Sequence, residues 1–358
     1  MESLQITAFA RHVSPLVGLS KSRLETLAML TLGMISARTV NLAHLAPERG
    51  AAGVKLASTY RRLQRFFQHV RLPQDWVAQA VAGLAGGPQR RVLVLDRTNW
   101  KVGTRDINLL VLAAVTRTGT VPLMWTVLDR PGNSGAAARM ALLARYIGIF
   151  GKDSIAMLLA DREFIGAAWL NHLIENDIPF TIRLREGMQA TLPDTRQTTL
   201  ATLLTGPRKG RKAVATLTGL SAPLHLSAKT PKRREAVILA TNRTGHAALA
   251  TYRKRWGIEM FFADSKTRGL NLEDTRLTDP AKLHLLTAIL ALAVAWAHRA
   301  ARLVLKAKAP ARKSHGYFAK SYFRTGLDFL RAQLRTNPVQ AIQLCKYIPK
   351  PTSHDRVV

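Results

Sequence analysis

The stretch Arg91-Val92-Leu93-Val94-Leu95-Asp96 decides the fold, because the helical patterns of the first 90 residues give way there to a strand. Its continuous run of β-branched and aliphatic residues is typical of a strand buried inside a sheet. We expect this strand to end on Asp96, since the polar residues Arg97, Thr98 and Asn99 follow. A buried strand that ends on a carboxylate predicts a polar site at that edge of the sheet.

The residues that follow alternate between strand and helix patterns. The expected elements are two strands, a helix, a strand, a helix and a strand, at 107–115, 121–128, 134–150, 155–160, 164–176 and 178–184. Short connections among the first three strands, with a turn at 117–120, favour an antiparallel meander. The strand at 155–160 is also expected to end on a carboxylate, Asp161. The fold class predicted from this order is mixed α/β, with helices on the faces of a mixed sheet.

The remaining segments flank or interrupt this core. We predict a helical domain at 1–88, the first part of the core at 89–185, a β-rich insertion at 186–247, a core helix at 248–275 and a helical region at 276–358. Within the first domain, helices are expected at 20–45 and about 55–70, followed by a Gly/Pro break at 81–90. The insertion has strand candidates at 213–217, 224–228 and 236–240, with basic tips at 206–212 and 229–234.

Charge is the main compositional signal. The 358 residues include 53 Lys and Arg against 22 Asp and Glu, a formal charge of +31, which favours a polyanionic partner such as DNA. A basic protein with no nucleic-acid role is the plainer alternative. The longest uncharged run, 283–298, is too short to cross a bilayer comfortably and indicates a buried helix, so no membrane partner is expected. One cysteine and no signal peptide favour the cytoplasm.

A helix is expected over residues 250–266, ATYRKRWGIEMFFADSK. At about 100° per residue, Tyr252, Arg255, Glu259 and Lys266 fall within roughly 60° of one another. The simplest interpretation is that these four residues form an ordinary charged helix face in contact with solvent. In the functional reading, the carboxylate binds a divalent cation while the cations and the phenol bind phosphate oxygens.

Three carboxylates could together form an oxygen-rich metal site. Asp96 and Asp161 would lie at neighbouring strand ends, and Glu259 would approach from a helix packed on that edge. Carboxylates suit two Mg²⁺ or Mn²⁺ ions, which catalyse phosphoryl transfer when they lie roughly 3.5–4 Å apart. Glu163, Asp106 and Asp129 are weaker candidates: the first could support the site from behind, and the others lie at turns.

The spacing Tyr252-x2-Arg255-x3-Glu259-x6-Lys266, with LDRTNWKVG around Asp96 and LLADREFIG around Asp161, resembles the insertion-sequence-4-type transposases. The resemblance runs from about residue 58 to 270. It implies a ribonuclease-H-like core with a β-rich insertion, and an Asp-Asp-Glu catalytic and metal-binding triad formed by Asp96, Asp161 and Glu259. It also implies that Tyr252, Arg255 and Lys266 contact DNA.

The activity implied by this resemblance is cut-and-paste transposition: binding of terminal inverted repeats, cleavage at the element ends and joining of the 3′-hydroxyl to target DNA. A homodimer on double-stranded DNA is expected, because two ends are cut together. Such a protein would be cytoplasmic in a bacterium and associated with the nucleoid when it is bound to DNA. A nuclease of the same fold without strand transfer, or an inactive DNA-binding descendant, are the alternatives.

Two further groups of residues are candidates for DNA contact. Arg61, Arg62 and Arg65 share one face of the helix expected at about 55–70, although a solvated basic helix explains them equally well. Some relatives cleave through a DNA hairpin and stack a flipped base on a tryptophan of the insertion. Residues 170–255 contain no tryptophan, and Trp256 is the nearest. The hairpin route is therefore in doubt for this chain.

Overall fold

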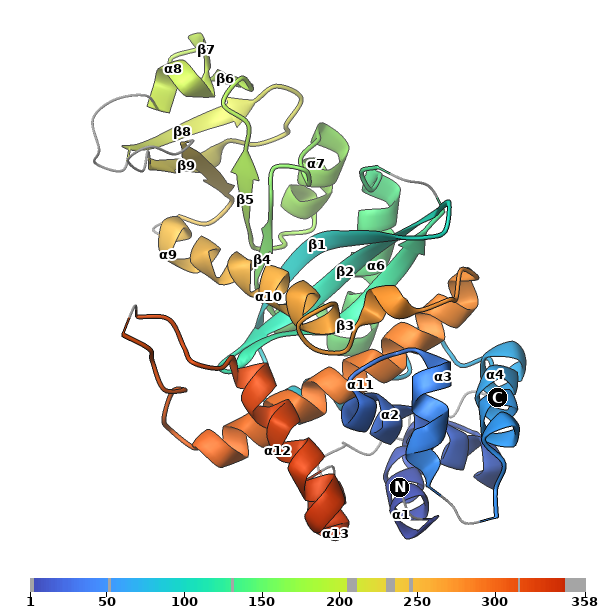
Figure 1. Ribbon diagram of the computed structural model, residues 1–358. Helices are drawn as coiled ribbons and strands as arrows, with labels where there is room; N and C mark the ends of the chain where they lie inside the picture. Colours follow the sequence, from blue (N-terminus) through green and yellow to red (C-terminus); the bar gives the residue numbers. More distant parts are fainter. Residues whose placement is uncertain are drawn as a thin grey trace.

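The computed structural model describes residues 3–50, 53–129, 132–204, 211–229, 236–244, 247–314 and 316–344. Its described strands form one ten-stranded mixed sheet in the order β3-β2-β1-β4-β5-β10-β9-β8-β6-β7. The N-terminal helices and α11–α13 pack together beside the β1–β3 end, and the insertion lies at the opposite end (Figure 1). The predicted mixed α/β class, a ribonuclease-H-like core with surrounding helices, is confirmed.

The N-terminal part is helical, as predicted. Its elements are α1 (Ser3–Val13), η1 (Ser14–Leu16), α2 (Lys21–Ala37), α3 (Leu42–Leu45), η2 (Ala46–Arg49), α4 (Leu56–His69) and α5 (Ala78–Ala85). The single helix expected over 20–45 is two, because Arg38 ends α2 in the left-handed conformation. The break expected at 81–90 begins later, since α5 continues to Ala85 and ends at Gly86.

The meander consists of β1 (Arg91–Val102), β2 (Arg105–Thr116) and β3 (Gly119–Leu128), paired antiparallel. The expectation that the first strand ends on Asp96 is wrong. Beyond Asp96, β1 keeps its hydrogen-bond partner β2 as far as the pair Val102 and Arg105. Only the parallel pairing with β4 (Ile155–Ala160) stops near this point, at Leu95 opposite Ala160.

The parallel half of the core follows the predicted order. Helix α6 (Ala136–Phe150) begins two residues later than expected and has Gly135 as its N-cap residue. After η3 (Lys152–Ser154) and β4 come α7 (Ala167–Glu175) and β5 (Phe180–Leu184), which pairs parallel to β4. The chain leaves β4 at Asp161, as the sequence predicted.

The insertion lengthens the main sheet. Its elements are β6 (Gln189–Thr191), β7 (Gln197–Thr199), α8 (Leu200–Leu204), β8 (Arg211–Leu217), β9 (Leu224–Lys229) and β10 (Val237–Thr241). Strand β10 runs antiparallel to β5 and so joins the insertion to the core by a continuous hydrogen-bond ladder. Most of both predicted basic tips lies outside the described residues.

The segment expected to be one helix over 250–266 has three parts: α9 (Ala248–Tyr252), η4 (Arg253–Arg255) and α10 (Trp256–Ser265). Helix α10 lies across the sheet on the side of β1–β3 (Figure 1) and packs on β3. Gly257 permits this packing, because a Cβ there would lie 2.2 Å from Thr120 Oγ1. A short η5 (Leu272–Asp274) follows.

Helix α11 (Pro280–Leu305) is the central helix of the molecule, as the uncharged run suggested. By length and composition it could cross a membrane, but 78% of its most apolar 18-residue window is buried inside the protein. It packs against α2, α5, β3 and α12 (Tyr322–Thr336), which is followed by α13 (Pro338–Gln343). Phe9 of α1 stacks on Trp296 of α11 at 5.2 Å between ring centroids.

Candidate active site

Asp96 and Asp161 follow a directly paired couple of residues on adjacent parallel strands. Leu95 of β1 lies opposite Ala160 of β4, so the two aspartates leave the shared ladder at the same level. Each carboxylate accepts a hydrogen bond from the next backbone N–H, Asp96 from Arg97 at 2.8 Å and Asp161 from Arg162 at 2.7 Å. The sheet therefore brings together the two carboxylates that the sequence predicted at strand ends.

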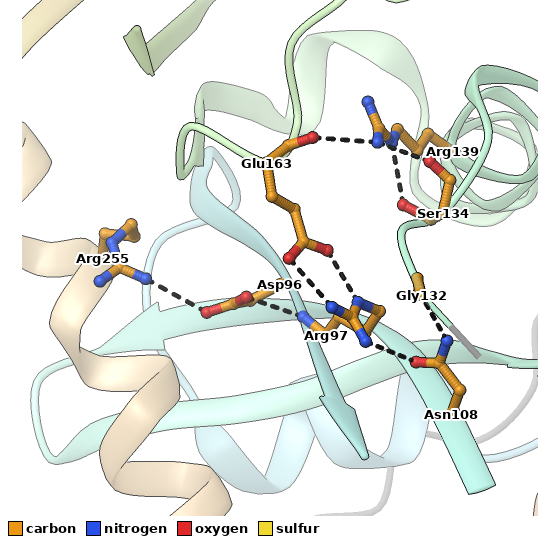
Figure 2. A network of polar contacts seen from close by, with 8 residues as sticks. All are labelled: Asp96, Arg97, Asn108, Gly132, Ser134, Arg139, Glu163 and Arg255. Carbon is orange, nitrogen blue, oxygen red and sulfur yellow. Dashed lines mark hydrogen bonds and ion pairs between the residues drawn. The ribbon is translucent and has the colours of Figure 1, made fainter. Parts of the chain in front are cut away.

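Glu259 approaches from α10, and Arg255 connects it to Asp96. The Arg255 guanidinium donates from Nη1 to Asp96 Oδ2 at 3.1 Å and from Nη2 to Glu259 Oε1. Only 11% of the Arg255 side chain and 16% of the Asp96 side chain are exposed. Figure 2 shows this guanidinium reaching from the helix to the Asp96 carboxylate. Two of the three predicted metal-binding carboxylates thus share one cationic group.

The third carboxylate, Asp161, has its own partners. Tyr252 Oη donates to Asp161 Oδ1 at 3.3 Å, and Arg183 Nη1 of β5 lies 4.0 Å from the same oxygen. Burial and the nearby Asp161 charge raise the pKa of the Tyr252 phenol above its usual value, so it remains a donor at neutral pH. Tyr252 and Arg255 therefore both face the carboxylates, as the helical spacing suggested.

The Asp96 environment disfavours an uncompensated negative charge. Burial, with smaller contributions from the carboxylates of Glu163 and Asp161, raises the pKa of Asp96 to about 6 against the opposing effects of the Arg97 N–H hydrogen bond and the Arg255 charge. A carboxylate in such surroundings is stabilised by an added cation. Its donor chemistry, together with that of Asp161 and Glu259, suits Mg²⁺ or Mn²⁺.

The present arrangement of side chains does not by itself form a metal cage. Within the described residues, no three His, Cys, Asp or Glu side chains are gathered closely enough to hold a metal ion. Between Asp96 and Glu259 that position is taken by the Arg255 guanidinium, a cation that satisfies the same oxygens. The residues fit a divalent cation on condition that Arg255 moves away from the carboxylates.

A second ion pair lies behind the aspartates. Arg97 donates from Nε to Glu163 Oε1 at 2.8 Å and from Nη2 to Oε2 at 3.2 Å. Figure 2 shows this pair flanked by Asn108 on one side and by Arg139 on the other. The sequence singled out Glu163 only as a supporting candidate and missed Arg97 and Arg139. The position of Arg97 directly after Asp96 was the available signal.

Lys266 lies apart from the carboxylates. Its Nζ donates to Asn99 O at 3.0 Å and pairs with Glu273 Oε1 at 2.8 Å, with the Trp100 ring 6.0 Å away. Lys266 caps the end of α10 and leaves helical geometry, with ψ −132°. The Lys266 side chain therefore contacts β1 at Asn99, three residues beyond Asp96, whereas the helical wheel predicted a position beside Glu259.

The three N-terminal arginines divide into two groups. Arg62 is engaged within the protein: its Nε donates to Thr26 Oγ1 at 2.8 Å, and its Nη2 donates to Ser22 O at 2.8 Å and pairs with Glu25. Arg61 and Arg65 are exposed on α4. Of the three arginines, Arg61 and Arg65 are therefore the exposed ones, whereas Arg62 is half-buried.

Trp256 directly follows Arg255 in the sequence and is 60% exposed. It lines a hollow of about 340 Å³ together with the β2–β3 turn, Met260 and the aromatic residues Phe318 and Tyr322. The Trp256 side chain is therefore accessible at the surface, in a hollow that none of Asp96, Asp161 and Glu259 lines.

Comparison with known proteins identifies the family. A solved structure with partial similarity is endonuclease V from Bacillus subtilis, which is 11% identical and has a TM-score of 0.26, with 66% of this chain and 90% of that chain covered. No curated protein matches. The model of the family described as transposase DDE domain matches residues 87–296, which include Asp96, Asp161 and Glu259. Because this match covers more than half of the 358 residues, the chain belongs to the DDE-domain transposase family.

Proposed function

We propose that this transposase is of the insertion-sequence-4 type, cleaves DNA at the ends of its element and joins the freed 3′-hydroxyl to target DNA. The observation that carries the proposal is the geometry of one sheet edge: Asp96 of β1 and Asp161, directly after the parallel strand β4, lie at the same level, and Arg255 links Asp96 to Glu259 of the facing helix. Asp96, Asp161 and Glu259 are the catalytic residues. The spacing of Tyr252, Arg255, Glu259 and Lys266 supports assignment to this type.

Asp96, Asp161 and Glu259 would hold two Mg²⁺ or Mn²⁺ ions. Such ions supply Lewis-acid stabilisation of charge on the attacking and leaving oxygens. The chain's own contribution is to orient the Asp96 and Asp161 carboxylates by the backbone N–H groups of Arg97 and Arg162, and to keep both in a largely buried, low-dielectric position. In that position their charge is weakly screened.

Arg255 and Tyr252 would bind the DNA backbone at the site. Once Arg255 is released from Asp96 and Glu259, its planar guanidinium can donate two parallel hydrogen bonds to a phosphate. Negative charge grows on that phosphate during in-line attack, and a fixed cation there stabilises the transition state by a few kcal/mol. Lys266, which follows the end of α10, would contact the DNA strand beyond the scissile position.

The proposed partner is double-stranded DNA, at the terminal inverted repeats and at the target. The formal charge of +31 and the exposed Arg61 and Arg65 support this proposal. Concerted cutting of two ends supports a homodimer on DNA. Such a protein acts in the bacterial cytoplasm, associated with the nucleoid.

The test uses the full chain and DNA fragments from the flanks of its coding region. We expect Asp96→Asn, Asp161→Asn and Glu259→Gln each to abolish cleavage in Mg²⁺ and to leave end binding within a few-fold of the unmodified protein. Glu186→Gln, which changes an exposed glutamate, is the matched control and should cleave normally. If one of these three variants cleaves DNA at the rate of the unmodified protein, the residue that it changes is not catalytic.

A second assay separates transposition from simple hydrolysis. Precut ends with a free 3′-hydroxyl are incubated with a supercoiled target plasmid, and joined products are counted. We expect joining that depends on all three carboxylates. Cleavage without joining would make the protein a nuclease, and end binding without cleavage would make it an inactive descendant.

A further inference from the structure

The sheet alone does not set the distance between the Asp96 and Asp161 carboxylates. The parallel ladder between β1 and β4 stops at Leu95 and Ala160, one residue before each aspartate. From there β1 is paired only with β2, while the chain after Asp161 turns, with Phe164 N donating to Asp161 O at 2.9 Å. Another contact must hold the two diverging segments together.

The Arg97–Glu163 pair joins these two segments. Both oxygens of Glu163 accept from the Arg97 guanidinium, at 2.8 and 3.2 Å, so the contact fixes orientation as well as distance. Successive side chains of a strand point to opposite faces, so Arg97 projects away from the face where Asp96 meets Arg255. Glu163 is thus engaged behind the site and does not join the Asp96–Glu259 cluster.

Both partners of this pair are anchored. Arg97 Nη1 donates to Oδ1 of the buried Asn108 at 3.3 Å, and Asn108 Nδ2 donates to Gly132 O at 2.9 Å. On the other side, Arg139, which is 4% exposed, donates from Nη2 to Glu163 O at 3.1 Å. Figure 2 shows the continuous chain of contacts from Arg139 through Glu163 and Arg97 to Asn108.

Additional contacts anchor Arg139 itself. It donates to Ile165 O at 3.2 Å, to Ser134 Oγ at 2.9 Å and to Ser134 O at 2.5 Å. The loop after β4 is therefore held to the start of α6 by a buried guanidinium, independently of the Asp161 side chain. The Arg97–Glu163 ion pair should add little net stability, because the cost of removing both charges from water offsets most of their attraction. Its defined geometry points to a role in positioning.

We infer that Arg97 and Glu163 are positioning residues that hold the Asp96 and Asp161 carboxylates at the separation required to bind divalent cations together. This inference rests on the metal site proposed above. Neither residue touches the cation or the DNA in this role. Their contribution resembles that of the outer partners of metal ligands, whose loss typically lowers metal affinity ~10- to 100-fold.

The test is Mn²⁺ binding to the full chain without DNA, measured by calorimetry and by the electron paramagnetic resonance signal of free Mn²⁺. The variants are Arg97→Lys, Arg97→Gln and Glu163→Gln, with thermal unfolding as the check of folding. Positioning predicts that all three bind Mn²⁺ about 10-fold or more weakly. Asp177→Asn, which breaks the exposed Arg243–Asp177 pair elsewhere, should bind normally.

Simple electrostatics predicts a different pattern, which makes the test decisive. If only charge mattered, Arg97→Gln would tighten Mn²⁺ binding, Glu163→Gln would weaken it and Arg97→Lys would leave it unchanged. That pattern, or unchanged affinity in all three variants, would overturn the inference while the metal site stands. If Mn²⁺ binds neither to the unmodified protein nor to Arg255→Gln, in which the competing guanidinium is removed, the proposed metal site is overturned and the inference with it.

Discussion

At the scale of single residues, the contacts of Arg255 in this structure compete with the metal binding proposed for the same two carboxylates. Its guanidinium pairs with Asp96 and Glu259, yet the proposed reaction requires those carboxylates for a cation. We expect Arg255→Gln to bind Mn²⁺ more tightly than the unmodified protein, by about 10-fold, because removal of a competing charge is worth roughly 1.4 kcal/mol or more. The same variant should cleave DNA more slowly, since it lacks the phosphate contact.

The control for this prediction is Lys254→Gln, the loss of an exposed positive charge one residue away. Its Mn²⁺ affinity should change little, because solvent screens an exposed charge. Titration of both variants by calorimetry provides the comparison. Weaker Mn²⁺ binding in Arg255→Gln than in the unmodified protein would show that Arg255 supports the ligands and does not compete with the cation.

Asp264 makes a pH-dependent contribution to stability away from the carboxylate cluster. It is 7% exposed, and burial raises the pKa of its carboxyl to about 7, against the opposing charge of Arg268. Its folded pKa lies above the unfolded value of 3.8, so the folded state binds more protons between these values and the free energy of unfolding falls as pH rises from about 4 to 7.

We therefore expect Asp264→Asn to stabilise the protein at pH 8 by up to about 4 kcal/mol and to have little effect at pH 4. Denaturant unfolding at both pH values measures the difference. A larger gain at pH 4 than at pH 8 would have the wrong sign for a buried carboxylate with a raised pKa.

At the scale of elements, the contact between α10 and β3 depends on the absence of a side chain at Gly257. A Cβ there would meet Thr120 Oγ1 at 2.2 Å and Thr120 Cβ at 3.4 Å. We expect Gly257→Ala to destabilise the protein by about 1–3 kcal/mol, in spite of the higher helix propensity of alanine, because overpacking displaces the helix. Displacement of α10 would also move Glu259 and slow cleavage.

A second substitution tests the cause of this loss. Thr120 Oγ1 is buried without a hydrogen-bond partner among the described residues, so its removal leaves no donor or acceptor unpaired. Thr120→Ala should restore most of the stability of Gly257→Ala, whereas the isosteric Thr120→Val should not. Equal behaviour of the two double variants in thermal unfolding would place the strain elsewhere.

The sequence predicted most helices and strands, but it failed where residues distant in the sequence determine how far a strand extends or where a side chain points. The strand from Arg91 was identified, but its continuation past Asp96 depends on β2, which no local pattern encodes. The helical wheel placed Tyr252 and Arg255 correctly. It misplaced Lys266, because the chain leaves helical geometry at that residue and Glu273 and Asn99 provide partners. Similarly, Arg62 has the pattern of a DNA contact, but residues of α2 engage it.

At the scale of the whole molecule, charge dominates the expected behaviour with DNA. Lys and Arg exceed Asp and Glu by 31, and many internal ion pairs still leave Arg61 and Arg65 exposed. We expect the logarithm of the DNA-binding constant to fall linearly with the logarithm of salt concentration, with a slope of about −0.9 for each phosphate neutralised. Arg61→Ala and Arg65→Ala should each reduce that slope by about 1, and Arg62→Ala should instead lower the melting temperature.

Fluorescence anisotropy across a salt series, paired with thermal unfolding, distinguishes these outcomes. An unchanged slope in Arg61→Ala and Arg65→Ala would remove α4 from the DNA-binding surface. A reduced slope in Arg62→Ala without loss of stability would mean that its contacts with Thr26 and Ser22 give way to DNA.

The central position of α11 has a consequence for the order in which a cell can make this protein. Helix α1 packs mainly on α2, and α2 and α5 both pack on α11, a segment that begins only at Pro280. A nascent chain emerges from the ribosome in sequence order, so α2 and α5 lack this packing partner until most of the protein has been translated. A transcript cut short before this helix would therefore yield a substrate for proteases, and no truncated fragment would remain to compete with the intact transposase for DNA.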